Sequence, residues 1–510
     1  MTFDDADYYD VLIVGAGLSG IDAAYRVRER NPELTYLIVE QRERIGGTWD
    51  LFRYPGVRSD SDIFTLSYPW NPWRGERTMA EGAEICEYIE QSARDFGIYP
   101  HIRFSTQVVS ADFDRSADLW TVDLLSDSGT RTVTTRFLYL CTGYYRYDAG
   151  YRPEFEGEDQ FTGQIVHPQF WPDDLDYAGK NVVVIGSGAT AVTLIPAMAA
   201  DAGHVVMLQR SPTYMFPYPW SDPMTKLVQR VLPWQAAHDI TRYRNAFVTL
   251  GLYSFCRRFP KASRKLIRRL ALHYLPDGYD VDTHFKPAYE PWDQRLCVIP
   301  EGDFYKVVAD GSAEVVTDTI ESFTPTGIRV SSGRELAADI VVTATGLDLV
   351  AFGGIDLSVD GERVDPGEKY GYRAYMLDDV PNFAWSVGYT NASWTLRVDL
   401  TSQAVAELLA HMRANGYTRA YPTLDGAKPK AHAFFDLSSG YVQRAGGRLP
   451  KAGEEAPWQV RHNALLDAID ARRYDVTEAM VFSRTEPAVA VVAPEPTDTP
   501  EAAEESETAQ

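Results

Sequence analysis

The chain has 510 residues, which is enough for two or three domains. Hydrophobic residues make up 45% and charged residues 24%, as in ordinary globular proteins, and no apolar run of about 18 residues indicates a membrane span. The formal net charge of -23 argues against nucleic acid as a partner. The acidic N-terminus, residues 1–5, leads into the first predicted strand and does not have the form of a signal peptide.

The first structural pattern is a glycine-rich turn between two predicted strands. An apolar run at residues 10–14 predicts a buried parallel strand, and the turn Gly15-Ala16-Gly17-Leu18-Ser19-Gly20 follows it directly. Residues 21–30 then predict a helix. The next apolar run, residues 36–39, ends in Glu40, which comes 20 residues after Gly20. This order of strand, turn, helix, strand and acid is typical of a dinucleotide-binding unit.

Each glycine of this turn has its own expected role. Gly15 permits the tight turn, Gly17 lets the backbone approach a pyrophosphate, and Gly20 lets the helix pack closely on the strand. The helix N-terminus offers unpaired N–H groups to the anion, and Glu40 is placed to bind a ribose hydroxyl. The alternative is a strand–helix turn that binds no ligand.

A second pattern, F-x-G-x-x-x-H-x-x-x-W-P, begins at Phe161 and ends at Pro172. It includes Gly163, His167 and Trp171, and composition alone would produce it in far fewer than roughly one in a thousand chains of this length. The pattern lies after the first nucleotide-binding unit and before a second glycine-rich unit that begins at residue 181.

The second unit has the turn Gly186-Ser187-Gly188-Ala189-Thr190-Ala191 after an apolar run at residues 181–185. Gly186 and Gly188 repeat the first two glycines of the fingerprint, and Ala191 takes the place of the third, as the fingerprint allows. Two such turns in one chain predict two nucleotide cofactors.

The end of the next strand distinguishes the two cofactors. Residues 205–208 lead into Arg210 and Ser211 and not into an acid. A carboxylate there would repel a 2′-phosphate, whereas a guanidinium and a hydroxyl would bind it. The sequence therefore predicts NADPH at the second turn and FAD at the first. The alternative for Arg210 is a solvated surface arginine.

Two related units with interleaved segments are expected, because an apolar strand followed by Thr-Gly recurs at residues 137–143 and 340–346. The predicted fold is α/β, with two interleaved Rossmann-like domains for FAD and NADPH and an inserted helical subdomain. The predicted segments are an FAD-binding domain at 1–145 and 347–484, an NADPH-binding domain at 146–217 and 286–346, a helical insertion at 218–285 and an acidic tail at 485–510.

The insertion differs in charge from the rest of the chain. Between Lys226 and Leu275 there are 11 Lys or Arg residues and one acid, Asp239, among many apolar residues. This predicts a pair of helices with a basic face, formed by Lys261, Arg264, Lys265, Arg268 and Arg269. Two interpretations stay open: a solvated helical cap, or a lid or surface that contacts anionic lipid.

The tail and the cysteines lead to predictions about disorder and about the location of the protein. The tail has seven acids and no base, so it is predicted to be disordered. The four cysteines form no C-x-x-C motif, which favours a reducing cytoplasm without a zinc site or a redox disulfide. The expected location is cytoplasmic, with peripheral membrane contact as the second interpretation of the insertion. The cysteines are Cys86, Cys141, Cys256 and Cys297.

The pattern at residues 161–172 resembles the fingerprint of type I Baeyer–Villiger monooxygenases, where a final Trp followed by Pro or Asp separates them from other flavin-containing monooxygenases. A second stretch agrees with the family pattern G-G-x-W-x4-Y-P-G-x3-D. It consists of Gly46-Gly47-Thr48-Trp49, Tyr54-Pro55-Gly56 and Asp60. The resemblance covers residues 8–484 and is strongest to the mycobacterial group that oxidises thioamide prodrugs. Residues 49–56, 291–297 and 387–395 carry that likeness.

The resemblance implies an FAD-containing, NADPH-dependent enzyme that converts ketones to esters or lactones with O2. In the family, a peroxide at flavin C4a attacks the ketone, and sulfides or thioamides are S-oxidised as well. By resemblance, Arg295 is the permanent cation that stabilises the negatively charged peroxyflavin and then the oxyanion of the tetrahedral adduct. Asp60 pairs with this arginine and orients it. The alternatives are an interdomain salt bridge for Arg295 and a helix N-cap for Asp60.

Other roles also follow from the resemblance alone. His167 and Trp171 would couple domain movement to cofactor position, although a histidine in a connection is as often structural. The remaining expectations place Gly47 and Trp49 near the flavin, and Asn391 and Trp394 at the substrate or flavin pocket; core packing explains Trp49 nearly as well. Many members have lysine where this chain has Gln294, so Arg210 and Ser211 would bind the 2′-phosphate with less help.

Two other functions remain as alternatives. The first is a flavin-containing N- or S-monooxygenase that forms no ester. The second is a membrane-associated nucleotide sensor that uses the basic insertion as its working surface and turns over no substrate.

Overall fold

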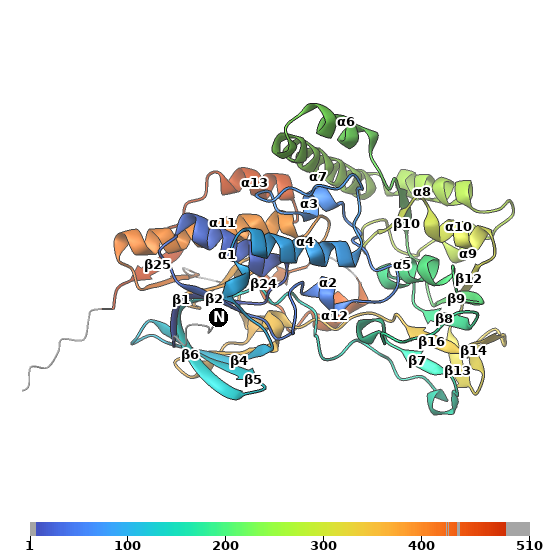
Figure 1. Ribbon diagram of the computed structural model, residues 1–510, viewed down its shortest axis with the longest axis horizontal. Coiled ribbons are helices and arrows are strands. Elements are labelled where there is room, and N and C mark those ends of the chain that lie inside the picture. The colour runs from blue at the N-terminus through green and yellow to red at the C-terminus, as the bar shows by residue number, and fades with distance from the viewer. Residues whose placement is uncertain (1–6, 425, 427, 436–438, 486–510) are drawn as a thin grey trace, which may run out of the picture.

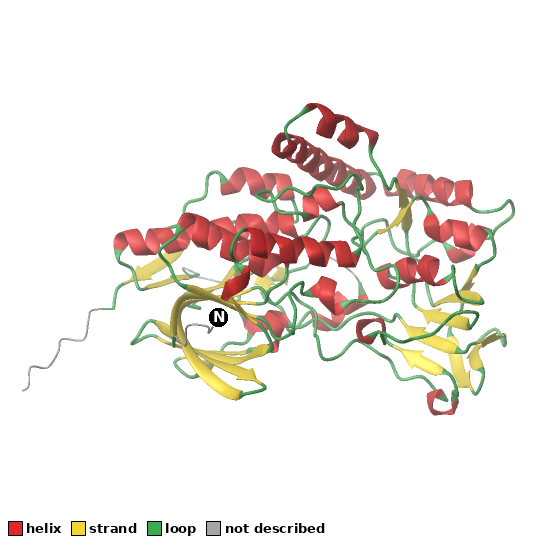
Figure 2. Cartoon of the chain, viewed as in Figure 1, coloured by secondary structure: helices red, strands yellow, loops and turns green. Residues whose placement is uncertain are grey.

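The computed structural model describes residues 7–424, 426, 428–435 and 439–485. The predicted acidic tail lies outside these described residues apart from Thr485. Figure 2 shows the strands gathered in two separate regions, with most of the helices above them in this view. Among the described helices, none combines the length and the apolar character that a membrane span requires.

The larger sheet is built from two distant stretches of the chain. Its strands are β1 (Tyr8–Val14), β2 (Tyr36–Val39), β3 (Ile102–Arg103), β4 (Thr106–Asp114), β5 (Leu119–Ser126), β6 (Gly129–Leu140), β17 (Asp356–Val359), β18 (Glu362–Arg363) and β21 (Phe383–Trp385). Their order is β18-β17-β4-β5-β6-β1-β2-β3, and β21 also pairs with β6. β1 is parallel to β2 and β6, whereas β4, β5 and β6 form an antiparallel meander.

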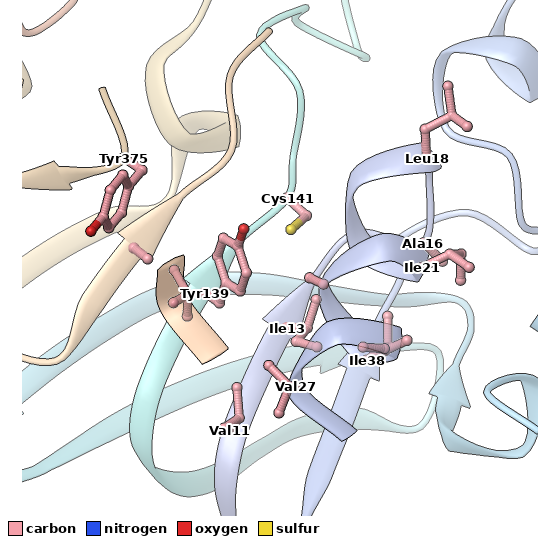
Figure 3. Close-up of a cluster of buried hydrophobic side chains, with 14 of the residues drawn as sticks. Val11, Ile13, Ala16, Leu18, Ile21, Val27, Ile38, Tyr139, Cys141 and Tyr375 are labelled. Atoms are coloured by element: carbon pink, nitrogen blue, oxygen red, sulfur yellow. The ribbon is translucent and has the colours of Figure 1, made fainter. Parts of the chain in front are cut away.

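Alternate residues of β1 belong to two separate cores, which explains the uninterrupted apolar sequence of this strand. Val11 and Ile13 pack on the side of helix α1 (Leu18–Arg30), as Figure 3 shows. Leu12 and Val14 pack on the opposite face, against the antiparallel meander. Two further helices lie on the α1 side, α4 (Gly82–Asp95) and α11 (Thr395–Asn415).

The smaller sheet is fully parallel and lies between the two stretches that build the larger one in sequence. Its strands are β7 (Gln164–Val166), β8 (Asn181–Ile185), β9 (His204–Gln209), β12 (Ala313–Thr317) and β16 (Ile340–Thr343), in the order β12-β9-β8-β16-β7. Helices α5 (Ala189–Met198) and α10 (Asp303–Ala309) pack on one face. The other face packs on a small antiparallel sheet of β13 (Ile320–Thr324), β14 (Gly327–Val330) and β15 (Glu335–Ala337).

The insertion contains more helices than the predicted pair, so that prediction was wrong. It consists of α6 (Pro223–Val231), α7 (Trp234–Arg258), α8 (Pro260–Tyr274) and the short α9 (Val281–His284). Prolines divide the segment, because Pro233 immediately precedes α7 and Pro260 occupies the first turn of α8. The parallel strands β10 (Met215–Tyr218) and β11 (Cys297–Pro300) flank the insertion.

Two element boundaries also differ from the sequence prediction. Helix α1 begins at Leu18 and not at residue 21, because the last residues of the glycine turn already form its first turn. Strand β6 begins at Gly129, well before the apolar run that marked it. Its first four residues are exposed or half-buried and the next four alternate between buried and half-buried, so an apolar run alone identifies only the doubly buried end.

Candidate active site

A cavity of about 1350 Å³ receives residues from both glycine-rich turns. Gly15 and Gly17 line it from the first turn, and Gly188 lines it from the second. Asp60 and Arg295 also line it. Of the other predicted site residues, Glu40, Gly47, Trp49 and Trp394 line this cavity. Those that do not are Gly20, Gly186, Ala191, Arg210, Ser211, His167, Trp171 and Asn391.

The first turn has the tight geometry that its glycines allow. Gly15 has a φ of +105°, and a Cβ there would lie 2.6 Å from the carbonyl oxygen of Cys141. A Cβ at Gly20 would lie 1.8 Å from the carbonyl oxygen of Gly15, so only glycine lets α1 approach the turn this closely. Gly17 faces Gly47, whose Cα lies 3.4 Å from the position of a Cβ on Gly17.

Glu40 is buried and holds the backbone of this region. Its Oε2 accepts a hydrogen bond from the Ala16 N–H at 2.7 Å, and its Oε1 accepts one from the Arg42 N–H at 2.9 Å. Burial raises the pKa of Glu40, while these two backbone donors act in the opposite direction. The acid that ends β2 is therefore tied to the glycine turn, and its contact with a ribose stays a prediction.

The second turn contrasts a tightly packed glycine with an open one. A Cβ at Gly186, where φ is +130°, would lie 2.2 Å from the carbonyl oxygen of Ala344. A Cβ at Gly188 would meet no atom within 4 Å, so this residue opens onto the cavity. Space kept free beside a helix N-terminus fits close approach of a phosphate. Ala191 is fully buried and packs α5 on the sheet.

Arg210 and Ser211 follow β9 and lie beside the second turn. The Ser187 hydroxyl donates to the Ser211 carbonyl oxygen at 3.0 Å, which ties the turn to this segment. Both Arg210 and Ser211 are exposed, and within the described residues no acid forms an ion pair with Arg210. The geometry is compatible with phosphate binding and equally with the solvated arginine of the alternative interpretation.

Asp60 and Arg295 form a bidentate ion pair. Arg295 Nε donates to Asp60 Oδ2 at 2.5 Å, and Nη2 donates to Oδ1 at 2.6 Å. The side chains are 26% and 32% exposed, so the pair is partly shielded but open to the cavity. Asp60 belongs to the stretch that builds the larger sheet, and Arg295 lies two residues before the start of β11. The pair is therefore a salt bridge between two distant stretches of the chain, and it forms part of the cavity wall.

Asp62, and not Asp60, is the helix N-cap in this segment. Helix α3 (Ile63–Leu66) is capped by Asp62, whose Oδ1 accepts from the Thr65 N–H at 3.0 Å. Asp62 is also bound by the side-chain amide of Asn245 at 3.0 Å. Because Asp62 supplies the cap, the Asp60 carboxylate is committed to Arg295.

A thiol lies close to this pair. Cys297 is buried, lines the cavity, and follows Arg295 by two positions. Burial, together with the negative charge of Asp60, raises the pKa of Cys297 to about 12. The thiol therefore stays protonated at neutral pH and does not serve as a nucleophile.

His167 and Trp171 hold the connection between the two sheets and not the cavity wall. His167 Nδ1 accepts from the Gln169 N–H at 3.2 Å, at the start of the short 3-10 helix Pro168–Phe170. A Cβ at Gly150 would lie 2.1 Å from the His167 ring, so glycine is needed there. Burial lowers the pKa of His167, which is therefore neutral at pH 7. Trp171 packs on the core of the smaller sheet.

Trp394 and Asn391 lie at two different cavities. The Trp394 indole lines the main cavity, donates from Nε1 to Ser19 Oγ at 2.9 Å, and contacts the Tyr144 ring at a centroid distance of 5.0 Å. Asn391 lines a second cavity of about 80 Å³ and donates to the His462 carbonyl oxygen at 2.8 Å. Asp60 and Arg295 line both cavities and so lie between them.

Several cavity residues were missed at the level of sequence. Arg58 lines the main cavity and forms an ion pair with Asp303 at 2.8 Å. Tyr144 and Tyr145 line it as well, and their hydroxyls lie 3.1 Å apart. The tyrosines could have been found, because they directly follow the Thr-Gly turn at the carboxyl end of β6, where ligands bind in such sheets. No local pattern marks Arg58.

The two turns and the cavity fit a pair of nucleotide cofactors. The cavity has a volume of about 1350 Å³, which exceeds the ~300–1,000 Å³ of a typical pocket for one drug-sized ligand. Glycines without side chains face it from both turns, and α1 and α5 begin there.

Comparison with known proteins agrees with this arrangement. Residues 72–235 match the model of flavin-binding monooxygenase-like proteins, and residues 13–75 match that of NAD(P)-binding Rossmann-like domains. The chain is 48% identical over 468 residues to the FAD-containing monooxygenase EthA of Mycobacterium tuberculosis, covering 92% of this chain and 96% of EthA. EthA of Mycolicibacterium smegmatis is 47% identical over 486 residues, covering 95% of this chain and 99% of that protein.

A solved structure shares the fold at lower sequence identity. The structure of oxidised steroid monooxygenase bound to NADP superposes with a TM-score of 0.75 at 23% identity, covering 94% of this chain and 100% of that one.

Proposed function

Because the chain belongs to the family of FAD-containing monooxygenases that includes EthA, we propose that it is a Baeyer–Villiger monooxygenase that uses NADPH and O2. It converts ketones to esters or lactones and also oxidises sulfides or thioamides at sulfur. The observation that carries this proposal is the Asp60–Arg295 pair, which lies at the cavity shared by the two glycine-rich turns.

The cofactors are assigned by the chemistry of the two turns. Gly15, Gly17, Glu40, Gly47 and Trp49 would hold FAD, since all of them line the main cavity on the side of the larger sheet. NADPH would lie at Gly186, Gly188 and the start of α5, with Arg210 and Ser211 at the 2′-phosphate. FAD, when bound, supplies the activated oxygen from O2, and NADPH supplies the electrons.

Arg295 supplies fixed positive charge where the substrate oxygen becomes negative. A guanidinium keeps its proton throughout, so its charge is present at every stage of the reaction. Asp60 holds the Nε and Nη2 edge of that group by two hydrogen bonds, which fixes the plane of the guanidinium. A donor fixed before reaction stabilises developing negative charge more effectively than one that must reorient.

Asp60 is thus a positioning residue, and Arg295 is the catalytic one. Glu40, although a buried acid whose pKa is raised, is bound to the backbone N–H groups of Ala16 and Arg42 and takes no proton in this scheme. His167 is neutral and lies outside the main cavity, so it acts on the connection between the sheets and not on the substrate.

The purified protein tests this proposal with a methyl ketone and an aryl methyl sulfide, each supplied with NADPH and O2. Ester from the ketone and sulfoxide from the sulfide are expected, and both products are identified by mass spectrometry. Sulfoxide without ester would assign the protein to the flavin-containing monooxygenases that lack Baeyer–Villiger activity. Bound nucleotide without any product would assign it to a sensor.

We also propose that the insertion contacts the membrane surface, in line with its excess of cations. Ion pairs weaken the basic face that the sequence predicted for this contact. Of the five residues predicted as a basic face on α8, Arg264 is paired with Glu290 and Arg268 with Asp282. Both acids follow the cation-rich segment in sequence and neutralise part of it, so α8 alone is a weak electrostatic surface.

A further inference from the structure

Exposed apolar side chains are concentrated in the helical insertion. Of the eighteen large apolar residues that are exposed in the described part of the chain, twelve lie between residues 224 and 272. Seven of them form what we call the α6–α7 ridge, namely Met224, Leu227, Val231, Ile240, Tyr243, Phe247 and Val248. Phe247 is 67% exposed and Val231 is 66% exposed. Figure 1 shows α6 and α7 projecting from the upper edge of the molecule.

The spacing of these residues places them on one side of each helix. Positions 224, 227 and 231 on α6, and 240, 243 and 247 on α7, are each separated by three and then four residues. Such residues form a stripe along one face of a helix. The stripe faces outward on both helices, which is the reverse of an ordinary amphipathic surface helix.

The outward orientation of α7 is fixed by buried polar contacts on its other face. Arg242 is buried, and its Nη1 donates to the carbonyl oxygens of Phe64, Thr65 and Ser67 at 3.0, 2.9 and 2.6 Å. On the same face, Asn245 donates to Asp62, and His238 hydrogen-bonds to Ser67 at 2.9 Å. Turning the apolar stripe inward would break all of these bonds and take the Arg242 donor away from the buried carbonyl groups of Phe64, Thr65 and Ser67.

The insertion that carries the ridge also carries unpaired cations. Apart from the buried Arg242, five cationic side chains of the insertion form no ion pair within the described part of the chain. Arg230 lies on α6 beside the ridge, Arg258 ends α7, and Lys261, Lys265 and Arg269 lie on α8. They stand out on a chain with a net charge of -23. An apolar face on an insertion that also exposes unpaired cations fits the interface of a membrane that contains anionic lipids.

We propose that the α6–α7 ridge docks on an anionic membrane, with its apolar side chains among the acyl chains and the unpaired cations of the insertion at the lipid headgroups. The inner side of the same helix reaches the active site, since Ala246, Thr249 and Leu252 line the small cavity beside Asp60 and Arg295. This gives the docking a consequence that rests on the proposed function. Apolar ketones dissolved in the bilayer reach the active site along α7 without crossing bulk water.

Sedimentation with vesicles tests the docking directly. The full chain is expected to sediment with phosphatidylcholine vesicles that contain phosphatidylglycerol, and much less with phosphatidylcholine alone or at high salt. The double variant Leu227→Glu/Phe247→Glu should lose at least about tenfold in vesicle affinity, because it places charges within the apolar ridge. Val109→Glu is the matched control, since Val109 is exposed on β4, far from the insertion in sequence.

Three results would overturn the docking. The wild-type chain could stay in the supernatant with anionic vesicles, or the double variant could bind as the wild type does. The ridge would belong to a second copy if the wild type formed a dimer that the double variant cannot form, as measured by analytical ultracentrifugation.

Turnover separates this proposal from the proposed function. The double variant should convert a short, water-soluble ketone as the wild type does, but should show a several-fold higher KM for a long-chain ketone presented in anionic vesicles. Equal KM values for the vesicle-borne ketone would contradict substrate entry along α7. If the wild type converted neither ketone, the proposed function would fail, while sedimentation would still decide the docking.

Discussion

The carboxylate of Asp60 accepts two hydrogen bonds, of 2.5 and 2.6 Å, from the guanidinium of Arg295, and the two residues are 235 positions apart in the sequence. One residue comes from the stretch that builds the larger sheet, and the other from the stretch that returns to the smaller one. The pair therefore forms only when both units are folded and docked. It sets a permanent cation at the cavity onto which both glycine turns open.

Removing the carboxylate should leave Arg295 charged but poorly oriented. For Asp60→Ala we expect kcat/KM for a ketone to fall by roughly ten- to a hundredfold, because misplacement of a catalytic group is costly. Flavin content, read from the absorbance of the purified protein, should stay close to that of the wild type. Glu290→Gln serves as the control, since it removes an arginine partner on the insertion. Unchanged ketone turnover in Asp60→Ala would refute the positioning role.

The two glycines of the second turn should respond differently to alanine. At Gly188 the added methyl group enters open space and the backbone φ of -76° suits alanine, so Gly188→Ala should fold normally. It should nevertheless bind NADPH more weakly, because the methyl group occupies the approach to the phosphate. Gly186→Ala should lower the melting temperature, since its positive φ and the Ala344 carbonyl cost on the order of 1–3 kcal/mol. Equal melting temperatures for both variants would contradict this distinction.

Arg210 should determine how strongly the protein prefers NADPH over NADH. We expect Arg210→Ala to raise the KM for NADPH by on the order of tenfold and to change the KM for NADH little, because the lost bond is to a charged phosphate. Gln294→Lys should lower the KM for NADPH, since residue 294 lines the cavity and a lysine there adds a cation. Arg473→Ala, at another exposed arginine, is the control. Equal changes in the KM for NADH and the KM for NADPH would show that Arg210 is a solvated surface arginine that does not bind the 2′-phosphate.

His238 should make the anchoring of the insertion sensitive to acid. Burial and the nearby Arg242 charge lower the pKa of His238 to about 4, whereas Asp239 acts in the opposite direction. Between pH 6.5 and 4 the unfolded chain therefore binds a proton that the folded chain does not, so stability falls as the pH falls. His238→Gln should reduce this loss by on the order of 1 kcal/mol, as measured by thermal unfolding at pH 7 and pH 5. The same pH dependence in the variant would exclude His238 as its source.

The parts of the fold that could be predicted from sequence are those with short-range signals. Both nucleotide-binding units were found because a doubly buried strand is an apolar run and a glycine turn directly follows it. The number of helices in the insertion was misjudged because apolar spacing continues across Pro233 and Pro260, which divide it. The basic face of α8 was overestimated because Glu290 and Asp282 pair with it from beyond the counted segment.

The active site was less accessible to sequence reasoning than the fold. Nothing local connects Asp60 to Arg295, and only the family resemblance suggested the pair. Asp62 offered an equally good carboxylate two positions away, and the choice between cap and ion pair depends on where Asn245 of α7 lies. Arg58 escaped notice for the same reason, since its partner Asp303 is distant in the chain.

The central claim is that the Arg295 cation makes ester formation possible. Its most direct test is the ester yield per NADPH consumed by Arg295→Gln, measured on a yellow preparation whose FAD content matches the wild type. The account predicts that ester formation falls by on the order of a hundredfold or more while FAD stays bound. An ester yield equal to that of the wild type would contradict it.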